Sequence, residues 1–283
     1  MKNLAYVFVL SCLGISLFSS CEKEGPEIIK GDRTLIADHT IAFEEVLRSI
    51  PVEYINAARK NLHIAYQHTS HGTQVPRGMF GLPDYMEGDE ILFAITDNDP
   101  QADKLDFRDY AMGSYAEAGV DGSDLSRNET AFIQATRNYL DDPNNSEINV
   151  VMWSWCNIAG HDVEGNYLPG MQNLINEYPE VSFIFMTGHA NKGDNVGSGK
   201  PKNQADLILD YCRENKFYCL DYYGIDTHDM DGNYWEDAGD DGNSSTGGNF
   251  YADWQNSHSV GAGYYENRNS PGGSVAYGEF LFS

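Results

Sequence analysis

Short apolar runs that do not alternate with polar residues are the feature that most constrains the fold of this chain. Strands that are apolar along their whole length are typical of a sheet covered on both faces, as parallel sheets are. We therefore expect a mostly parallel, five-stranded sheet, with four strands in clear runs and a fifth in a weaker one. These runs cover residues 62–66, 148–153, 181–186 and 217–220, and the weaker one covers 105–111.

Helical patterns lie between the apolar runs. Ser126 and Glu129 have the spacing of a capping box, and an apolar helical stripe follows them as far as Pro143. Two further helices are expected at 168–178 and 203–215. This alternation of strands and helices predicts an α/β fold, a three-layer α/β/α sandwich in which crossover helices join parallel strands.

The beginning of the chain has the pattern of an export signal. Lys2 precedes an apolar run, residues 4–18, that is too short to span a membrane comfortably. Phe18-Ser19-Ser20-Cys21 resembles a lipoprotein cleavage box, which predicts that Cys21 carries a lipid. A plain secretory signal is the alternative.

These observations divide the chain into three parts. We expect a lipoprotein signal peptide at 1–20, a charged tether at 21–37 and a single domain at 38–283. A lipid on Cys21 would hold that domain at the outer membrane or cell surface, with the periplasmic face as the alternative.

The charge of the chain excludes one large class of partners. It has 43 acidic and 18 basic residues, which gives a formal net charge of −25. Binding to nucleic acid depends on lysine and arginine displacing counterions from phosphates, so we expect no nucleic-acid partner.

Polar and chemically capable side chains follow the expected strands. In an open α/β sheet, ligands bind beyond the carboxyl ends of the strands, so these segments are the expected site. They are His68-Thr69-Ser70-His71-Gly72-Thr73-Gln74, Ser154-Trp155-Cys156-Asn157 and Thr187-Gly188-His189-Ala190-Asn191, and near the end of the chain Asp253-Trp254-Gln255-Asn256-Ser257-His258.

The order of these motifs resembles that of the SGNH hydrolases, also called GDSL-like esterases. The resemblance implies that Ser70 is the nucleophile, that Asn157 is a side-chain donor to the oxyanion, and that His258 is the general base. It also implies that Asp253 orients His258 and that Gly113, or alternatively Gly122, is the glycine of the second motif. His68-Thr69-Ser70 stands where the family has Gly-Asp-Ser, and Asp253 precedes His258 by five positions where the family has three.

The resemblance also implies a function. A serine hydroxyl attacks an ester once a neighbouring imidazole accepts its proton, and this chemistry requires neither an organic cofactor nor a metal. We expect His71, His189 and Gln74 to contact the substrate. Export and an aromatic-rich segment at 221–256, which we expect to be a long loop or a hairpin facing the substrate, indicate an esterase that removes acyl groups from a polysaccharide.

Three other interpretations stay open. Histidines at the strand ends have the chemistry of transition-metal ligands; these are His68, His71, His189 and His258. A glycoside hydrolase or polysaccharide lyase would use His/Asp acid–base chemistry, with Asp237, Asp240 and Asp241 as its acids. A non-catalytic glycan-binding lipoprotein would keep the fold without the triad.

Overall fold

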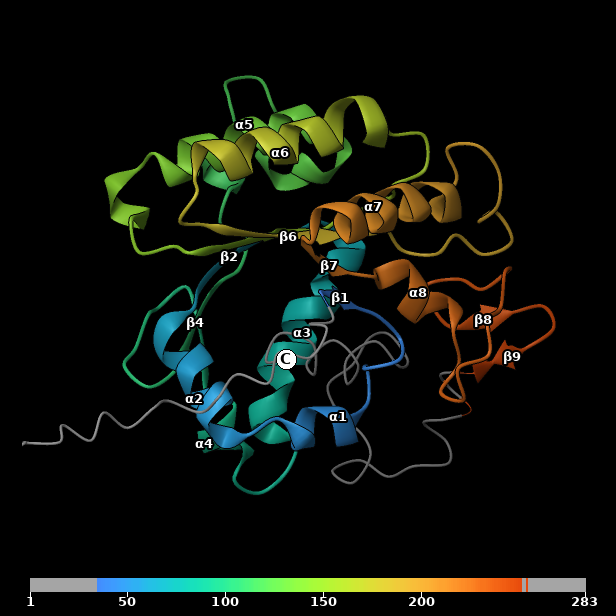
Figure 1. Cartoon of the computed structure of the whole chain (residues 1–283), viewed down its shortest axis with the longest axis horizontal. Coiled ribbons are helices and arrows are strands. Elements are labelled where there is room, and N and C mark those ends of the chain that lie inside the picture. Colours follow the sequence, from blue (N-terminus) through green and yellow to red (C-terminus); the bar gives the residue numbers. More distant parts are fainter. Residues whose placement is uncertain (1–34, 251–252, 254–283) are drawn as a thin grey trace, which may run out of the picture. The chain divides into compact units, whose positions relative to one another are not determined.

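A seven-stranded sheet forms the centre of the protein in this computed structural model, which describes residues 35–250 and Asp253 (Figure 1). Every hydrogen-bonded pair of strands in the sheet is parallel. The predicted α/β class and parallel sheet are thus confirmed. In spatial order the strands are β1 (Ile36–Ala37), β7 (Tyr218–Leu220), β6 (Ser182–Met186), β5 (Val150–Trp153), β2 (His63–Gln67), β4 (Leu105–Arg108) and β3 (Ile95–Asp97).

The expected number of strands, five, is wrong. The five expected strands are present as β2, β4, β5, β6 and β7, and two more, β1 and β3, lie at the edges of the sheet. These edge strands have two and three residues, respectively. Segments this short have no apolar run that a sequence pattern can detect.

Helices cover both faces of the sheet. In Figure 1, α5, α6 and α7 lie above it, whereas α1 to α4 lie below it. The helices predicted at 168–178 and 203–215 are confirmed as α6 and α7. The bounds are α1 (Glu44–Ser49), α2 (Val52–Asn61), α3 (Gln74–Gly81), α4 (Asp89–Leu92), α5 (Glu129–Leu140), α6 (Leu168–Glu177) and α7 (Pro201–Asn215).

Two hydrophobic cores explain why the strands are apolar at every position. In β2, Ala65 belongs to the core under α5 to α7, whereas Ile64 and Tyr66 belong to the core on the opposite face. The side chains of β5 are shared between the two cores in the same way, with Val151 in the first core and Met152 in the second. Successive side chains of a strand point to opposite faces, so a sheet covered on both sides buries them all.

The beginning of α5 differs from the expected capping box. Its N-cap is Asn128, whose Oδ1 accepts the backbone N–H of Ala131 at 3.0 Å. Ser126 lies instead in a preceding 3₁₀ segment, η4 (Gly122–Arg127), and its hydroxyl donates to Asp124 Oδ1 at 2.9 Å. The capping-box prediction was wrong because the serine hydroxyl already has this local partner.

The segment from residue 221 onwards contains a helix as well as the expected hairpin. α8 (Tyr222–Thr227) follows β7 directly, and β8 (Asn243–Ser244) pairs with β9 (Gly248–Asn249) in antiparallel fashion. Tyr222 and Tyr223 are 0% and 5% exposed, so the expectation that they face a substrate is wrong. α8 turns both rings into the interior.

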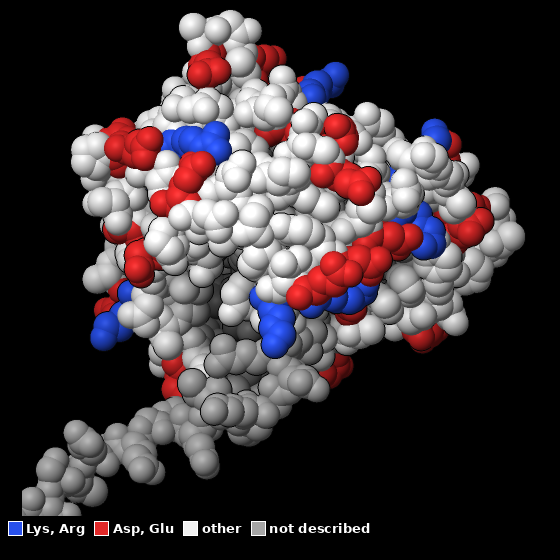
Figure 2. Space-filling model, turned by 45° about the horizontal axis from the view of Figure 1, so that its top comes forward, with Lys and Arg blue, Asp and Glu red and all other residues white. Residues whose placement is uncertain are grey.

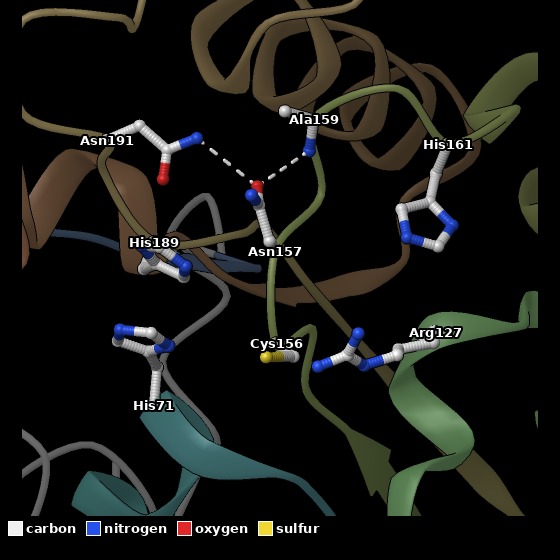
Figure 3. A pocket seen from close by; sticks show the side chains of 8 residues that line it. All are labelled: His71, Arg127, Cys156, Asn157, Ala159, His161, His189 and Asn191. Carbon is white, nitrogen blue, oxygen red and sulfur yellow. Dashed lines mark hydrogen bonds between the residues drawn. The ribbon is translucent and has the colours of Figure 1, made fainter.

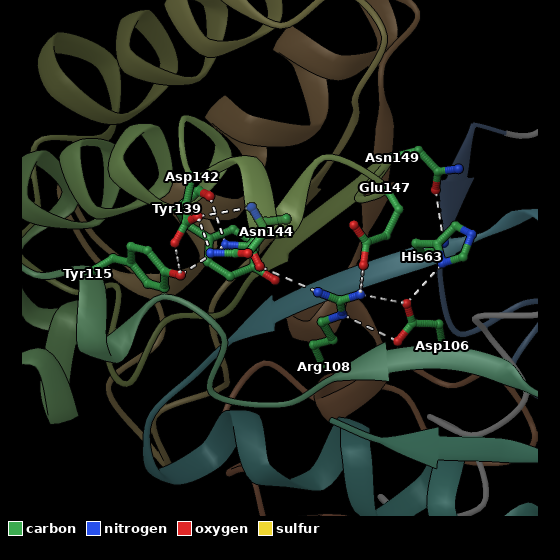
Figure 4. Close-up of polar contacts among 10 residues, drawn as sticks. His63, Asp106, Arg108, Tyr115, Tyr139, Asp142, Asn144, Glu147 and Asn149 are labelled. Atoms are coloured by element: carbon green, nitrogen blue, oxygen red, sulfur yellow. Dashed lines mark hydrogen bonds and ion pairs between the residues drawn. The ribbon is translucent and has the colours of Figure 1, made fainter. Parts of the chain in front are cut away.

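A polar network joins β2, β4 and the segment before β5 (Figure 4). His63 Nδ1 lies 2.9 Å from Asp106 Oδ2, and the His63 backbone N–H donates to Asn149 Oδ1 at 2.9 Å. Arg108 donates to Asp106 at 3.1 Å and to Glu147 at 2.6 Å. The buried carboxylate of Asp106 therefore has charged partners, which is the usual condition for burying a charge.

The surface carries the strong negative charge of the sequence. On the face that includes α5 to α7, acidic side chains outnumber basic ones (Figure 2). Within residues 35–250, the helices are too short or too polar to cross a membrane. The signal peptide, Cys21 and His258 lie outside the described residues.

Candidate functional site

The order of the strands places a crevice at the carboxyl ends of β2 and β5. After β2 the chain forms β3 and β4 on one side of that strand, and it then forms β5 on the other side. The segments that leave β2 and β5 therefore run in different directions. This reversal is the position where doubly wound α/β sheets bind ligands.

A cavity of about 610 Å³ lies at this reversal (Figure 3). A volume of this size suits a small ligand or one part of a larger one. The residues that line the cavity come from the segments after β2, β5 and β6 and from the end of η4; they are His71, Arg127, Cys156, Asn157, Ala159, His161, His189 and Asn191.

Ser70 begins a tight turn directly after β2. Its φ is 52°, in the left-handed region that residues other than glycine rarely adopt. The turn is crowded, because a Cβ on Gly72 would lie 1.8 Å from the side-chain oxygen of Ser154. Strained backbone of this kind is concentrated at functional sites.

Ser70 is exposed and is not itself among the residues that line the cavity, but its side chain interacts with that of Cys156, which is. Burial and the nearby Asp124 raise the pKa of the Cys156 thiol above its ordinary value, although Ser70 and Arg127 act in the opposite direction. A thiol with a raised pKa stays protonated and is a poor nucleophile. We therefore do not assign the nucleophile to Cys156.

Asn157 has its side chain fixed by two hydrogen bonds. Its Oδ1 accepts the backbone N–H of Ala159 at 3.0 Å and Nδ2–H of Asn191 at 3.2 Å (Figure 3). Because these donors identify the oxygen, the other end of the amide is the NH₂ group. That NH₂ group is an available donor, since it has no partner among the described residues.

Two histidines and an aspartate meet at one side of the cavity. The rings of His71 and His189 are stacked with their centroids 3.7 Å apart, and His71 Nε2 lies 2.9 Å from Asp240 Oδ2. One potential metal-ligating atom from each of the three residues lies within 4.8 Å of the other two. His71 and His189 were expected at the site from the sequence, and this is the cluster whose residue types can hold a metal ion.

The environment of this cluster favours a neutral His189 and an ionised Asp240. Burial, followed by the neighbouring His71, lowers the pKa of His189 below its ordinary value. The hydrogen bond with His71 lowers the pKa of Asp240, against the effect of burial.

A second histidine–carboxylate pair lies on another part of the cavity wall. His161 Nδ1 is 2.8 Å from Glu129 Oε2, at the beginning of α5. Burial acts to raise the pKa of Glu129, but hydrogen bonds from His161 and Asn166 outweigh it and the pKa is lowered. Arg127 adds a guanidinium group, which Figure 3 shows between Cys156 and His161.

Other residues expected at the site lie elsewhere. Gly113 and Gln74 are not among the residues that line the cavity. The Gly113 backbone N–H donates to the Tyr110 carbonyl at 3.4 Å, and Gln74 Oε1 accepts the Tyr222 hydroxyl at 2.6 Å. Of the proposed base and its partner, Asp253 is described and exposed, whereas His258 lies outside the described residues.

One of the histidines considered as metal ligands points away from the cluster. The His68 side chain is fully buried and its Nε2 lies 2.8 Å from Asp109 Oδ1. Its ring packs against those of Tyr66 and Tyr110. His68 is therefore part of the packing at the end of β2.

The three acidic residues considered for acid–base chemistry have different roles. Asp237 accepts hydrogen bonds from Ser244 and Ser245, which lower its pKa to about 2. Asp241 accepts the backbone N–H of Asn243 at 3.1 Å. Asp237 and Asp241 thus hold the hairpin, whereas Asp240 is the one of the three that contacts a cavity histidine.

Three residues at or beside the cavity were not expected from the sequence: His161, Glu129 and Arg127. Glu129 and Arg127 lie at the η4–α5 junction, so reading the residues after each strand does not find them. His161 follows β5 by eight positions, beyond the motif that ends the strand. A histidine and a glutamate this far apart in sequence give no signal that they pair.

Comparisons of the chain with protein-family models, with curated proteins and with solved structures found no match.

Proposed function

We propose that this protein is a serine esterase of SGNH-like architecture that removes acyl groups from a polysaccharide. The observation that carries the proposal is the position of Ser70. Ser70 lies in a left-handed turn at the reversal of the strand order, and its side chain interacts with Cys156, which lines the same cavity as the fixed amide of Asn157.

The strand order supports the SGNH-like part of the proposal. Without the edge strands, the order is β7-β6-β5-β2-β4. In chain order these strands are the fifth, fourth, third, first and second of a five-stranded doubly wound sheet, which is the flavodoxin-like arrangement. Ser70 follows the first of these strands and Asn157 follows the third, as in the sequence motifs.

In the proposed mechanism, Ser70 Oγ attacks the acyl carbonyl carbon while an imidazole accepts the hydroxyl proton. The negative charge that develops on the carbonyl oxygen is stabilised by the Asn157 NH₂ group. The sugar alcohol leaves with the proton from the imidazolium. Water then attacks the acyl-Ser70 ester, releasing the carboxylic acid and restoring the serine.

We assign the base to His258 and its orientation to Asp253, as the resemblance implies. We also propose that the protein is exported and held at the membrane by a lipid on Cys21. An anchored esterase of this kind would act on acylated glycans at the cell surface.

The test compares Ser70→Ala with Ser123→Ala, a serine of η4 whose side chain contacts Asp121 instead of the cavity. Hydrolysis is measured on a chromogenic acetyl ester and on acetylated polysaccharides. We expect S70A and H258A to abolish turnover, S123A to keep it, and Asn157→Ala to lower kcat by about 10²–10³-fold. Unchanged hydrolysis by S70A would refute the proposal.

A further inference from the structure

The cluster of His71, His189 and Asp240 has no part in the proposed esterase mechanism. Its residues come from three separate segments: the turn after β2, the segment after β6 and the segment between α8 and β8. The His71 and Asp240 side chains are 28% and 34% exposed, so the cluster is open on one side, whereas His189 is buried.

The hydrogen bonding of His189 defines which of its ring nitrogens is available. Nδ1 lies 2.9 Å from the backbone carbonyl oxygen of Ala190. A carbonyl can only accept, so Nδ1 carries the proton, and Nε2 of the neutral ring presents a lone pair. This arrangement, in which a backbone carbonyl fixes the tautomer of a histidine, is typical of metal-ligating imidazoles.

Nε2 of His189 is buried and makes no hydrogen bond of ordinary geometry within residues 35–250, although the Cys156 backbone also interacts with the ring. Buried polar atoms without a partner are uncommon in folded proteins and call for an explanation. A bound cation would supply the missing partner.

The segment that carries His189 is also held in place by the protein. Asp226 is buried, and its carboxylate accepts the Ala190 N–H at 3.0 Å. This hydrogen bond fixes the backbone directly after His189.

We propose that His71, His189 and Asp240 bind one divalent transition-metal ion of the zinc class at the wall of the cavity. Two imidazole nitrogens and one carboxylate oxygen are a ligand set of the kind that leaves one position of a zinc site open. Because His71 and His189 line the cavity, that open position faces it. The proposal does not depend on the esterase activity.

The three ligand atoms must move closer together when an ion binds. An ion with bonds of about 2.0–2.1 Å in tetrahedral geometry places its ligand atoms about 3.3 Å apart. The three ligand atoms lie within 4.8 Å of one another, so the stacked rings must tilt toward a common point. To bind an ion through Nε2, a neutral His71 ring carries its proton on Nδ1, which has no hydrogen-bond partner among the described residues.

The test is the zinc content of the purified full chain, stripped with a chelator and dialysed against Zn²⁺, with affinity measured by calorimetry. We expect one equivalent of zinc. Asp240→Asn keeps the shape of the side chain but removes its charge, and we expect it to weaken binding more than 10-fold, because even outer-shell changes cost 10–100-fold. His71→Gln should weaken binding to a similar degree.

His161→Gln is the matched control, because it alters the other histidine–carboxylate pair of the same cavity. We expect its zinc affinity to equal that of the unaltered protein. Ser70→Ala should also bind zinc normally, which separates this test from that of the esterase. The proposal is overturned if the unaltered protein fails to bind zinc stoichiometrically, or if D240N and H71Q bind zinc as tightly as H161Q.

Discussion

Ser70 combines a reactive side chain with an unfavourable backbone conformation. A φ of 52° is ordinary for glycine, whereas it costs an L-residue about 1–2 kcal/mol. Four other described residues that are not glycine also have positive φ, so this conformation draws attention to Ser70 only together with its position after β2. The left-handed backbone at Ser70 also gives a prediction about stability, which can be tested without a substrate.

We predict that Ser70→Gly is more stable than Ser70→Ala by about 1 kcal/mol, because glycine relieves the left-handed strain. The matched control is the same pair of substitutions at Thr69, whose φ of −144° is extended. There, glycine should be the less stable of the two. Urea unfolding measures the difference between the glycine and alanine variants at each position. If glycine is the less stable of the two at Ser70 as well as at Thr69, Ser70 is not strained.

At the level of single elements, the interior strands are predictable because each buries both of its faces. Their apolar runs are continuous, and the polar motifs that follow them mark the edge where the cavity lies. β1 and β3 were missed because an edge strand of two or three residues leaves almost no pattern. The η4–α5 junction was misread because two short polar residues, Ser126 and Asn128, compete for the same capping role.

The cap of α5 gives the second prediction. Asn128→Ala removes the acceptor for the Ala131 N–H and should lower the free energy of unfolding by about 1 kcal/mol. Asn128→Asp keeps an acceptor at that position and should retain most of the stability. Both are measured by urea unfolding, and an N128A variant as stable as the unaltered protein would show that Asn128 is not the cap.

At the scale of the whole molecule, the site is assembled from segments that lie far apart in the chain. That His71, Asn157 and His189 lie together at the cavity could be predicted because they follow strands, and parallel strands end at one edge. Asp240 could not be paired with His71 in advance, since the segment that carries it has no periodic pattern to fix its path. Arg127 was missed for a similar reason, because it precedes a helix.

Burial of Asp221 should make the stability of the whole molecule depend on pH. Burial raises the pKa of Asp221 to about 6, against hydrogen bonds from Gly224 and Thr187, whereas the unfolded chain has the ordinary value of 3.8. The folded state therefore holds this proton more tightly. The resulting stabilisation is complete below the unfolded pKa and is lost as the pH rises through about 6.

Asp221→Asn isolates this effect, because asparagine keeps an acceptor for the Gly224 N–H but does not titrate. We predict that the Tm of the unaltered protein falls relative to that of D221N as the pH rises from about 4 to 7. Thermal unfolding at a series of pH values measures the difference. A difference that does not change with pH would contradict the raised pKa.

The proposed function requires Ser70 to be an activated nucleophile. Labelling of the full chain with a fluorophosphonate, followed by peptide mapping by mass spectrometry, tests this directly. We predict one covalent adduct, on Ser70, that is absent from S70A and present in S123A. An unlabelled protein, or an adduct that forms equally in S70A, would contradict it.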